Sequence, residues 1–258
     1  MRIAVHPFAS GSDMEKNLNA IRRAVQRAAA QKVRLLVFHE CALCGYPPRE
    51  TSVEALDRSV IAGALSQVAG LAGEYGLYIA VGSVRYEGDK RFNTLLLFDD
   101  CGDEAGCYDK TALWGWDVEN FARGQNTGVF EIDGIPVGFR ICFDVRFPES
   151  FRQLYQQGVK LCFVSFSDSA DAPNPARYDM LKSHLVTRAA ENIMTVVSTN
   201  TASGCPTAPT MVVTEDGSIA KEAPAGRSGL MIYDYTVPEP SWGTEGRRVN
   251  SDYFLDIK

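Results

Sequence analysis

The chain contains 258 residues, 45% of them apolar and 22% charged, and its formal net charge is −6 at pH 7. This length is enough for one α/β domain with a full core, and the composition is that of an ordinary globular protein. The negative charge argues against a surface that binds nucleic acid or an anionic membrane. No apolar run approaches the roughly 20 residues that a membrane span needs. We therefore expect one domain over residues 1–258, with no nucleic-acid or membrane partner.

The N-terminus and the cysteines indicate a cellular compartment. Residues 1–7 are expected to form an edge strand. They lack the longer apolar core and the small-residue cleavage site of a signal peptide. The seven cysteines are an odd number and do not have the spacing of a small disulfide-rich scaffold. Reduced thiols in the cytosol fit this usage better. We expect a cytoplasmic protein.

Strand and helix patterns alternate along the first part of the chain. Asp13 can cap a helix whose apolar residues recur three or four apart on one face. The segment before His39 is a short apolar run, which is typical of a buried strand. The predicted elements are a strand at 2–8, a helix at 14–31, a strand at 34–38 and a helix at 53–75.

The rest of the chain adds hairpins to this pattern. Turn residues at 87–90, 133–134 and 215–217 each join two strand-like runs. Hairpins among buried strands indicate mixed sheets, each covered on one side by helices. The predicted elements are strands at 77–86, 91–98, 129–132, 135–142, 160–166, 194–199 and 229–235, and helices at 150–157 and 176–192.

Three reactive side chains follow apolar strands or precede polar turns. Cys142 ends the strand at 135–142, and in α/β proteins the loops at strand ends border the ligand crevice. A thiol held there is a candidate nucleophile, although a free cysteine is also a common core residue. Glu40 and Lys110 occupy comparable positions. Each alone would be interpreted as a solvated loop residue, but the three together are more specific.

Five segments around these positions carry a family pattern. In order, spacing and local sequence they resemble the nitrilase superfamily of carbon–nitrogen hydrolases, in its amidase-like branch, over nearly the whole chain. The segments are VFHECALCGY around Glu40, YDKTAL around Lys110, ENFARG from Glu119, RICFDVRFPE around Cys142, and RAAEN at 188–192.

The resemblance implies a fold and an assembly. The expected fold is a four-layer α-β-β-α sandwich with two mixed β-sheets. Members of the family commonly pair into dimers, often extended into larger assemblies, so a homodimer or a larger homo-oligomer is expected. The C-terminal tail, from about residue 243, resembles the segment that such proteins lay against a partner subunit.

The resemblance also implies a catalytic mechanism for a small amide substrate, without a metal or another cofactor. Cys142 would be the nucleophile, and the cation of Lys110 would favour its thiolate. Glu40 would carry the proton. Lys110 and the backbone N–H of Phe143 would stabilise the oxyanion. Glu119 would position Lys110 and raise the pKa of Glu40 by like-charge repulsion.

Three positions depart from the family pattern, which weakens any transfer of substrate. His39 replaces a proline, Ala112 a histidine and Leu181 a tryptophan. Small amides, N-carbamoyl compounds and nitriles therefore remain as substrates, with ω-amides of dicarboxylic acids or deaminated peptide-like amides the best match to the Cys142 segment. Arg146 would bind a substrate carboxylate, or would form an ion pair with an acid such as Asp144.

Other interpretations of the same residues exist. Cys41 and Cys44 form a Cys-x-x-Cys, but a zinc site needs two more ligands at matched spacing. A Cys-His pair would use one of the three histidines, His6, His39 or His184. A non-catalytic binding protein on this fold would be favoured only if a triad residue were missing, and none is.

Overall fold

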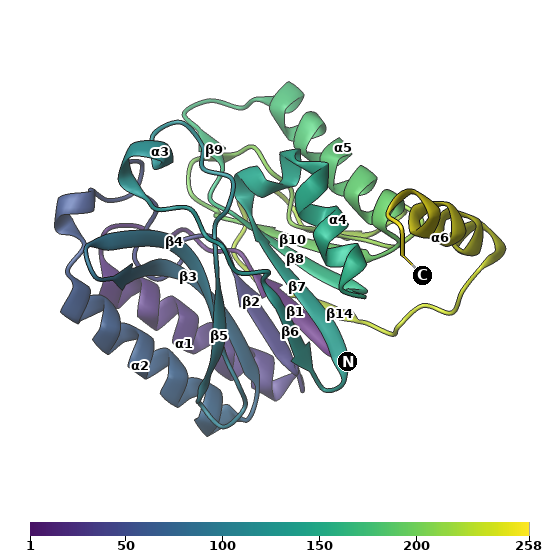
Figure 1. Cartoon of the computed structure of the whole chain (residues 1–258). Coiled ribbons are helices and arrows are strands. Elements are labelled where there is room, and N and C mark those ends of the chain that lie inside the picture. Colours follow the sequence, from purple (N-terminus) through teal and green to yellow (C-terminus); the bar gives the residue numbers. More distant parts are fainter. Residues whose placement is uncertain (258) are drawn as a thin grey trace.

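A computed structural model of the chain describes residues 1–257. Two six-stranded sheets pack face to face, and helices cover the outer face of each (Figure 1). Apolar side chains form one core between the sheets, and one further core lies under the helices of each sheet. This arrangement confirms the predicted four-layer α-β-β-α sandwich with two mixed sheets.

The first sheet has the strand order β14-β1-β2-β3-β4-β5. Parallel pairing joins β1, β2 and β3, and antiparallel pairing joins the others. The helices α1 (Met14–Ala30) and α2 (Arg58–Tyr75) lie against it (Figure 1). The strands are β1 (Arg2–His6), β2 (Leu35–Phe38), β3 (Tyr78–Glu87), β4 (Lys90–Phe98), β5 (Glu104–Asp109) and β14 (Met231–Asp234).

The second sheet has the strand order β13-β12-β10-β8-β7-β6. Its central strands β7, β8 and β10 are parallel. The helices α4 (Pro148–Gln156) and α5 (Pro175–Asn192) cover it. The strands are β6 (Val129–Ile132), β7 (Ile135–Ile141), β8 (Leu161–Phe166), β10 (Thr195–Asn200), β12 (Met211–Val213) and β13 (Ile219–Glu222), and β9 (Ser169–Ala170) pairs separately with β11 (Cys205–Pro206).

The predicted elements agree with the structure within two residues, except for one helix. The N-terminal strand is not the expected edge strand, because β1 lies between β14 and β2 in the first sheet. The helix predicted at 53–75 is divided: a short 3₁₀ turn, η1 (Val53–Ala55), ends at Leu56, and α2 starts anew after its cap Asp57. The Asp57 carboxylate accepts hydrogen bonds from Ser59 N and Val60 N, which favours a new helix start over a continuous helix. The strand β5 was not predicted, because its sequence EAGCYD has no clear alternation.

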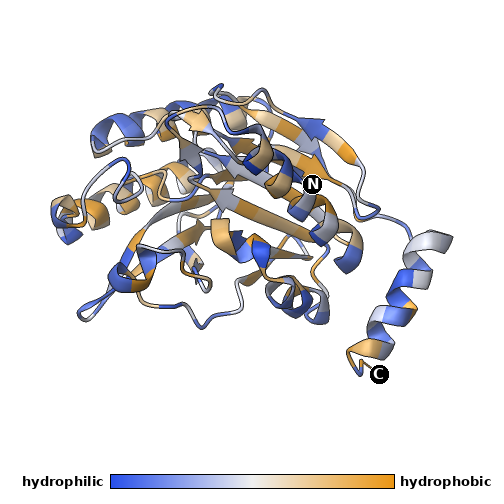
Figure 2. Ribbon diagram, turned by 90° about the horizontal axis from the view of Figure 1, so that it is seen from above, coloured by the Kyte–Doolittle hydropathy of each residue, from blue (hydrophilic) through white to orange (hydrophobic). Residues whose placement is uncertain are grey.

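The C-terminal tail predicted from about residue 243 is a helix, α6 (Trp242–Phe254). It lies beside the main body at the end of an extended segment (Figure 2). Its contacts with α4 include Tyr155 Oη to Asp252 Oδ1 at 2.7 Å and Arg152 Nη1 to Ser251 Oγ at 3.2 Å. Within residues 1–257, no helix has both the length and the hydropathy that a membrane span requires.

Candidate active site

Glu40, Lys110 and Cys142 follow three different strands, β2, β5 and β7, and the fold brings them together. Glu40 Oε1 lies 2.8 Å from Lys110 Nζ, and both side chains are buried. Lys110 and Cys142 line one cavity of about 300 Å³, which we call the active-site cavity. β2 lies in the first sheet and β7 in the second. The end of β8, the parallel neighbour of β7, contacts the end of β2, because Ser165 Oγ donates a hydrogen bond to the Phe38 carbonyl oxygen at 2.9 Å. Glu40 and Cys142, far apart in the chain, therefore follow strand ends that the two sheets bring close together.

The Glu40 carboxylate is held at both oxygens. Oε1 also accepts a hydrogen bond from Asn93 Nδ2 at 2.7 Å, and Oε2 accepts one from Ser167 N at 2.8 Å. These donors fix the orientation of the carboxylate toward Lys110. Neither Asn93 nor Ser167 was predicted from the sequence, because a polar residue within or just after a strand carries no distinctive pattern of its own.

The second carboxylate on Lys110 comes from Asp117, not from Glu119. Asp117 Oδ2 lies 2.8 Å from Lys110 Nζ, and its Oδ1 accepts a hydrogen bond from Tyr46 Oη at 2.7 Å. Glu119 is exposed in the same short helix α3 (Asp117–Asn120). The contact predicted between Glu119 and Lys110 is therefore wrong. Residues two apart on a helix point to opposite sides, and Asp117 is the one that points inward.

Cys142 opens a 3₁₀ turn, η2 (Cys142–Arg146), directly after β7, and has a positive φ of 46°. The turn is fixed by the buried carboxylate of Asp144. This carboxylate accepts hydrogen bonds from Ile141 N at 2.9 Å, Ala112 N at 2.7 Å and Tyr108 Oη at 2.8 Å. Left-handed backbone is strained for a residue with a side chain. The hydrogen bonds to Asp144 stabilise this conformation of Cys142, whose thiol lines the active-site cavity.

The electrostatics differ from the expected thiolate stabilised by Lys110. Burial raises the pKa of Cys142 well above its usual value, the charge of Glu40 adds to the rise, and Lys110 opposes it. Burial also raises the pKa of Glu40, against the opposing charge of Lys110. For Lys110, burial lowers the pKa, but Glu40 and the other acidic groups reverse this and leave it raised. The resting thiol is therefore neutral, so it needs a base.

Two charged pairs and one further cation surround the cavity mouth. Arg177 binds the Asp168 carboxylate with both Nε and Nη2, at 2.9 and 2.6 Å, and Arg49 Nη2 lies 2.8 Å from Asp171 Oδ1. Arg146 lies against the Phe143 ring, with Cζ 5.5 Å from the centroid. Within residues 1–257 no carboxylate oxygen lies within 4.0 Å of the Arg146 guanidinium nitrogens. Arg146 therefore does not form the alternative ion pair with Asp144.

Comparison with known proteins decides the family. The sequence model described as carbon-nitrogen hydrolase matches residues 2–239. The chain belongs to the carbon–nitrogen hydrolase family. The chain is also similar to a solved structure of the NitN amidase from Nesterenkonia sp. AN1, with a TM-score of 0.80, 26% identity and 99% of both chains covered. The predicted resemblance to the nitrilase superfamily is confirmed.

Curated relatives agree with this assignment. The hydrolase Rv0480c of Mycobacterium tuberculosis is 30% identical over 65% of this chain and 61% of its own length. The 2-oxoglutaramate amidase of Bacillus subtilis is 34% identical over 50% of this chain and 49% of its own length. The matches thus span only about half to three fifths of these relatives.

The three departures from the family pattern have different surroundings in this carbon–nitrogen hydrolase. His39 is buried beneath the site, and its Nε2 lies 2.9 Å from Ser10 Oγ. Ala112 contributes only its backbone N–H, to Asp144. Leu181 lines the active-site cavity, where its small side chain leaves more room than a tryptophan would. Among the described residues that line this cavity there is no histidine, which does not favour the Cys-His alternative.

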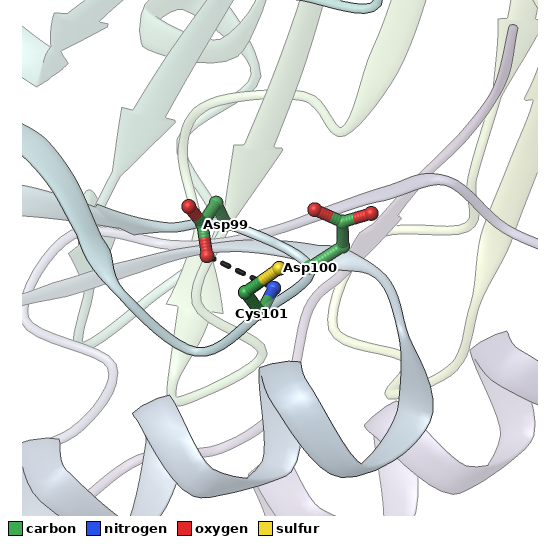
Figure 3. Close-up of side chains that lie close together, drawn as sticks. All are labelled: Asp99, Asp100 and Cys101. Carbon is green, nitrogen blue, oxygen red and sulfur yellow. Dashed lines mark hydrogen bonds between the residues drawn. The ribbon is translucent and has the colours of Figure 1, made fainter.

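Two other clusters contain cysteines that do not line the active-site cavity. Cys41 and Cys44 are buried together in an apolar cluster with Tyr46, and Cys41 Sγ contacts Asn93 Oδ1 at 3.7 Å. Asp99, Asp100 and Cys101 approach one another at the turn after β4 (Figure 3). Their carboxylates are already engaged. Asp99 Oδ1 accepts hydrogen bonds from Cys101 N and Asp103 N, and Asp100 pairs with Arg34.

Proposed function

We propose that this carbon–nitrogen hydrolase is an amidase that converts a small primary amide to a carboxylate and ammonia through a thioester on Cys142. The contact that carries the proposal is the buried ion pair between Glu40 and Lys110, since Lys110 also lines the active-site cavity together with Cys142. A proton carrier, a cation and a nucleophile held close together are the three groups that amide hydrolysis requires.

The reaction would proceed in two halves. Glu40 takes the thiol proton as the Cys142 sulfur attacks the amide carbon, and the negative oxygen is stabilised by Lys110 and by the N–H of Phe143. Collapse of this intermediate breaks the C–N bond, and Glu40 returns the proton to the leaving nitrogen, so that ammonia departs. A water then gives its proton to Glu40 and attacks the thioester, which releases the carboxylate and restores the thiol.

The raised pKa of Glu40 and the structures of a similar amidase support this order of events. A raised pKa suits Glu40 for both accepting and returning a proton, because it brings the carboxyl closer to the operating pH. In the similar Nesterenkonia amidase, the acetamide moiety of fluoroacetamide is added covalently at the active-site cysteine of a variant with glutamine in place of a glutamate. The alanine variant of that cysteine has been solved with butyramide.

Arg146 supports a substrate that carries a carboxylate. It lines the active-site cavity together with Phe143, and the two other arginines of the lining already have acidic partners. A guanidinium without such a partner is suited to bind a carboxylate through two parallel hydrogen bonds. We therefore place ω-amides of short dicarboxylic acids first among the substrates to test.

The deciding experiment is a screen for ammonia release over small amides, N-carbamoyl compounds and nitriles, with intact-mass detection of an acyl group on the protein. We expect release from amides and a mass increase that is absent in Cys142→Ala. Cys142→Ala and Lys110→Ala should each lose turnover by several orders of magnitude, whereas Cys101→Ala, which removes an exposed thiol, should keep it. Wild-type release by Cys142→Ala would overturn the proposal. If the enzyme prefers nitriles or N-carbamoyl compounds, the proposed amide substrate is wrong.

A further inference from the structure

A second cavity, of about 580 Å³, lies at the end of β1 and shares no lining residue with the active-site cavity. One stripe of α1 forms its wall, and the segment that leads into β14 forms its edge. We call it the α1 cavity. Its lining residues are His6, Phe8, Ala9, Lys16, Asn19, Ala20, Arg23, Ala24, Arg27, Ser228 and Gly229.

The spacing of residues on α1 explains both the hollow and its charge. The lining positions on this helix recur three or four residues apart, so they share one face. Ala20 and Ala24 have short side chains and leave the space open. Lys16, Arg23 and Arg27 stand along the same face, which gives a cationic wall on a chain whose net charge is −6.

The two arginines of this wall have no acidic partner. Arg23 and Arg27 are exposed, and within residues 1–257 no carboxylate oxygen lies within 4.0 Å of their guanidinium nitrogens. Their neighbour Arg22 is different, because it donates hydrogen bonds to Asn19 Oδ1 at 2.6 Å and to Gln67 Oε1 at 3.1 Å. Two free guanidinium groups therefore lie on one side of the cavity.

The cavity also contains a buried polar group with no partner. His6 is only 6% exposed, and its Nδ1 makes no hydrogen bond within the described residues. The backbone of Gly229 lies near the ring but not in hydrogen-bonding geometry with Nδ1. Burial and the charges of Arg27 and Arg23 lower the pKa of His6 to about 4, so the ring is neutral and carries one N–H. The His6 ring lines the α1 cavity, so an anion held there can contact it.

We propose that the α1 cavity binds a small organic anion with at least two negative charges, held by Arg23 and Arg27 and contacted by His6. Guanidinium groups bind carboxylate and phosphate oxygens through paired hydrogen bonds, and a neutral imidazole donates one more. The volume falls within the range of small-molecule sites, about 300–1,000 Å³. The inference is independent of the proposed amidase activity, since none of these residues belongs to that site.

The test uses histidine side-chain NMR on the full-length protein at neutral pH. The chain has three histidines, so a histidine-labelled sample gives a spectrum in which His6 can be assigned with a His6→Gln variant. Glutarate and glycerol 3-phosphate are titrated separately as probes of carboxylate and phosphate recognition. The charge-matched variants are Arg23→Gln/Arg27→Gln, and Lys32→Gln/Lys90→Gln as the control, whose two exposed cations do not line the cavity.

We expect at least one probe to shift the His6 resonance in a saturable way and to leave His184, on α5, unchanged. The Arg23→Gln/Arg27→Gln variant should bind that probe about tenfold more weakly or worse, whereas the control should bind within about twofold of the wild type. The probe that binds more tightly identifies the anionic group. The proposal is overturned if neither probe shifts the His6 resonance in a saturable way up to about 20 mM. A Kd of that size corresponds to only about 2 kcal/mol of binding free energy. Equal weakening in both variants also overturns the proposal.

Discussion

At the residue scale, the site depends on how two carboxylates share one ammonium group. Glu40 Oε1 and Asp117 Oδ2 each lie 2.8 Å from Lys110 Nζ, and all three side chains are buried. Removing one member of a buried charged group leaves the others uncompensated. We therefore propose that Asp117 positions Lys110 and, through its charge, raises the pKa of Glu40.

The first prediction compares Asp117 with Glu119, the residue predicted from the sequence to position Lys110. Asp117→Asn should lower kcat about 10²-fold or more, because Lys110 loses part of its orientation toward the developing oxyanion. Glu119→Gln should stay within about twofold of the wild type, since Glu119 is exposed. Steady-state kinetics on the best amide from the screen measures both, with thermal unfolding as the control for folding. A larger loss in Glu119→Gln than in Asp117→Asn would contradict the geometry.

The second prediction concerns the pH dependence of kcat/KM. The base form of Glu40 is the carboxylate, and burial raises the pKa of this group. Activity should therefore appear only as the pH rises through a value above the usual glutamate pKa of about 4.3. Asp117 adds to the rise in the pKa of Glu40, so the acid limb of the residual activity in Asp117→Asn should move to lower pH. A limb that does not move would show that another group sets it.

At the element scale, strand β3 pairs beside β2, and its continuation runs close against the backbone that follows β2. A Cβ on Gly82 would lie 2.2 Å from the His39 carbonyl oxygen and 2.5 Å from Cys41 N. Both neighbours are backbone atoms on either side of Glu40, so they cannot move away as a side chain would. The absence of a side chain at Gly82 is thus a condition for the position of Glu40.

The third prediction follows from this close approach. Gly82→Ala should destabilise the protein by about 1–3 kcal/mol, the usual cost of overpacking, and should lower kcat because Glu40 shifts relative to Lys110. Gly63→Ala is the matched control: it lies exposed on α2 with nothing within 4 Å of an added Cβ, and a helix gains up to about 1 kcal/mol from alanine over glycine. Chemical denaturation and kinetics test both. Equal behaviour of the two variants would refute the steric argument.

At the scale of the whole molecule, α6 presents large apolar side chains to solvent. Trp242 is 96% exposed and Phe254 78% exposed, while the contacts of α6 with α4 are largely polar. Exposed apolar residues in this number on one helix are typical of an interface. Homodimer formation remains a prediction, and we propose that α6 contributes to the contact.

The fourth prediction tests this assembly. The wild type should have the mass of a dimer or a larger homo-oligomer by light scattering after size exclusion, and Trp242→Ser/Phe254→Ser should shift it toward the monomer. Val60→Ser, which changes a half-exposed residue on α2, should leave the mass unchanged. A monomeric wild type at about 50 µM, a concentration at which a specific dimer with a micromolar Kd would be well populated, would rule out the assembly.

How much the sequence predicted depends on whether a feature is local. The helix at 14–31 was predicted with its cap Asp13, because capping and apolar spacing involve neighbouring residues. Hairpin turns were predicted for the same reason. Glu40, Lys110 and Cys142 were found because each stands in a distinctive segment at a strand end. Domain organisation and cytoplasmic location stay predictions.

The sequence by itself determined the family and the layered fold, since short motifs and apolar periodicity carry these. It also predicted three side chains as catalytic, Glu40, Lys110 and Cys142, and their catalytic roles stay a prediction. Only the tertiary structure decided which acid contacts Lys110, because Asp117 and Glu119 lie in the same short segment and differ only in the side of α3 that they occupy. It also decided the protonation of Cys142, since burial and the charge of Glu40 outweigh Lys110. Both depend on distances and burial between residues far apart in the chain, and sequence spacing does not carry these.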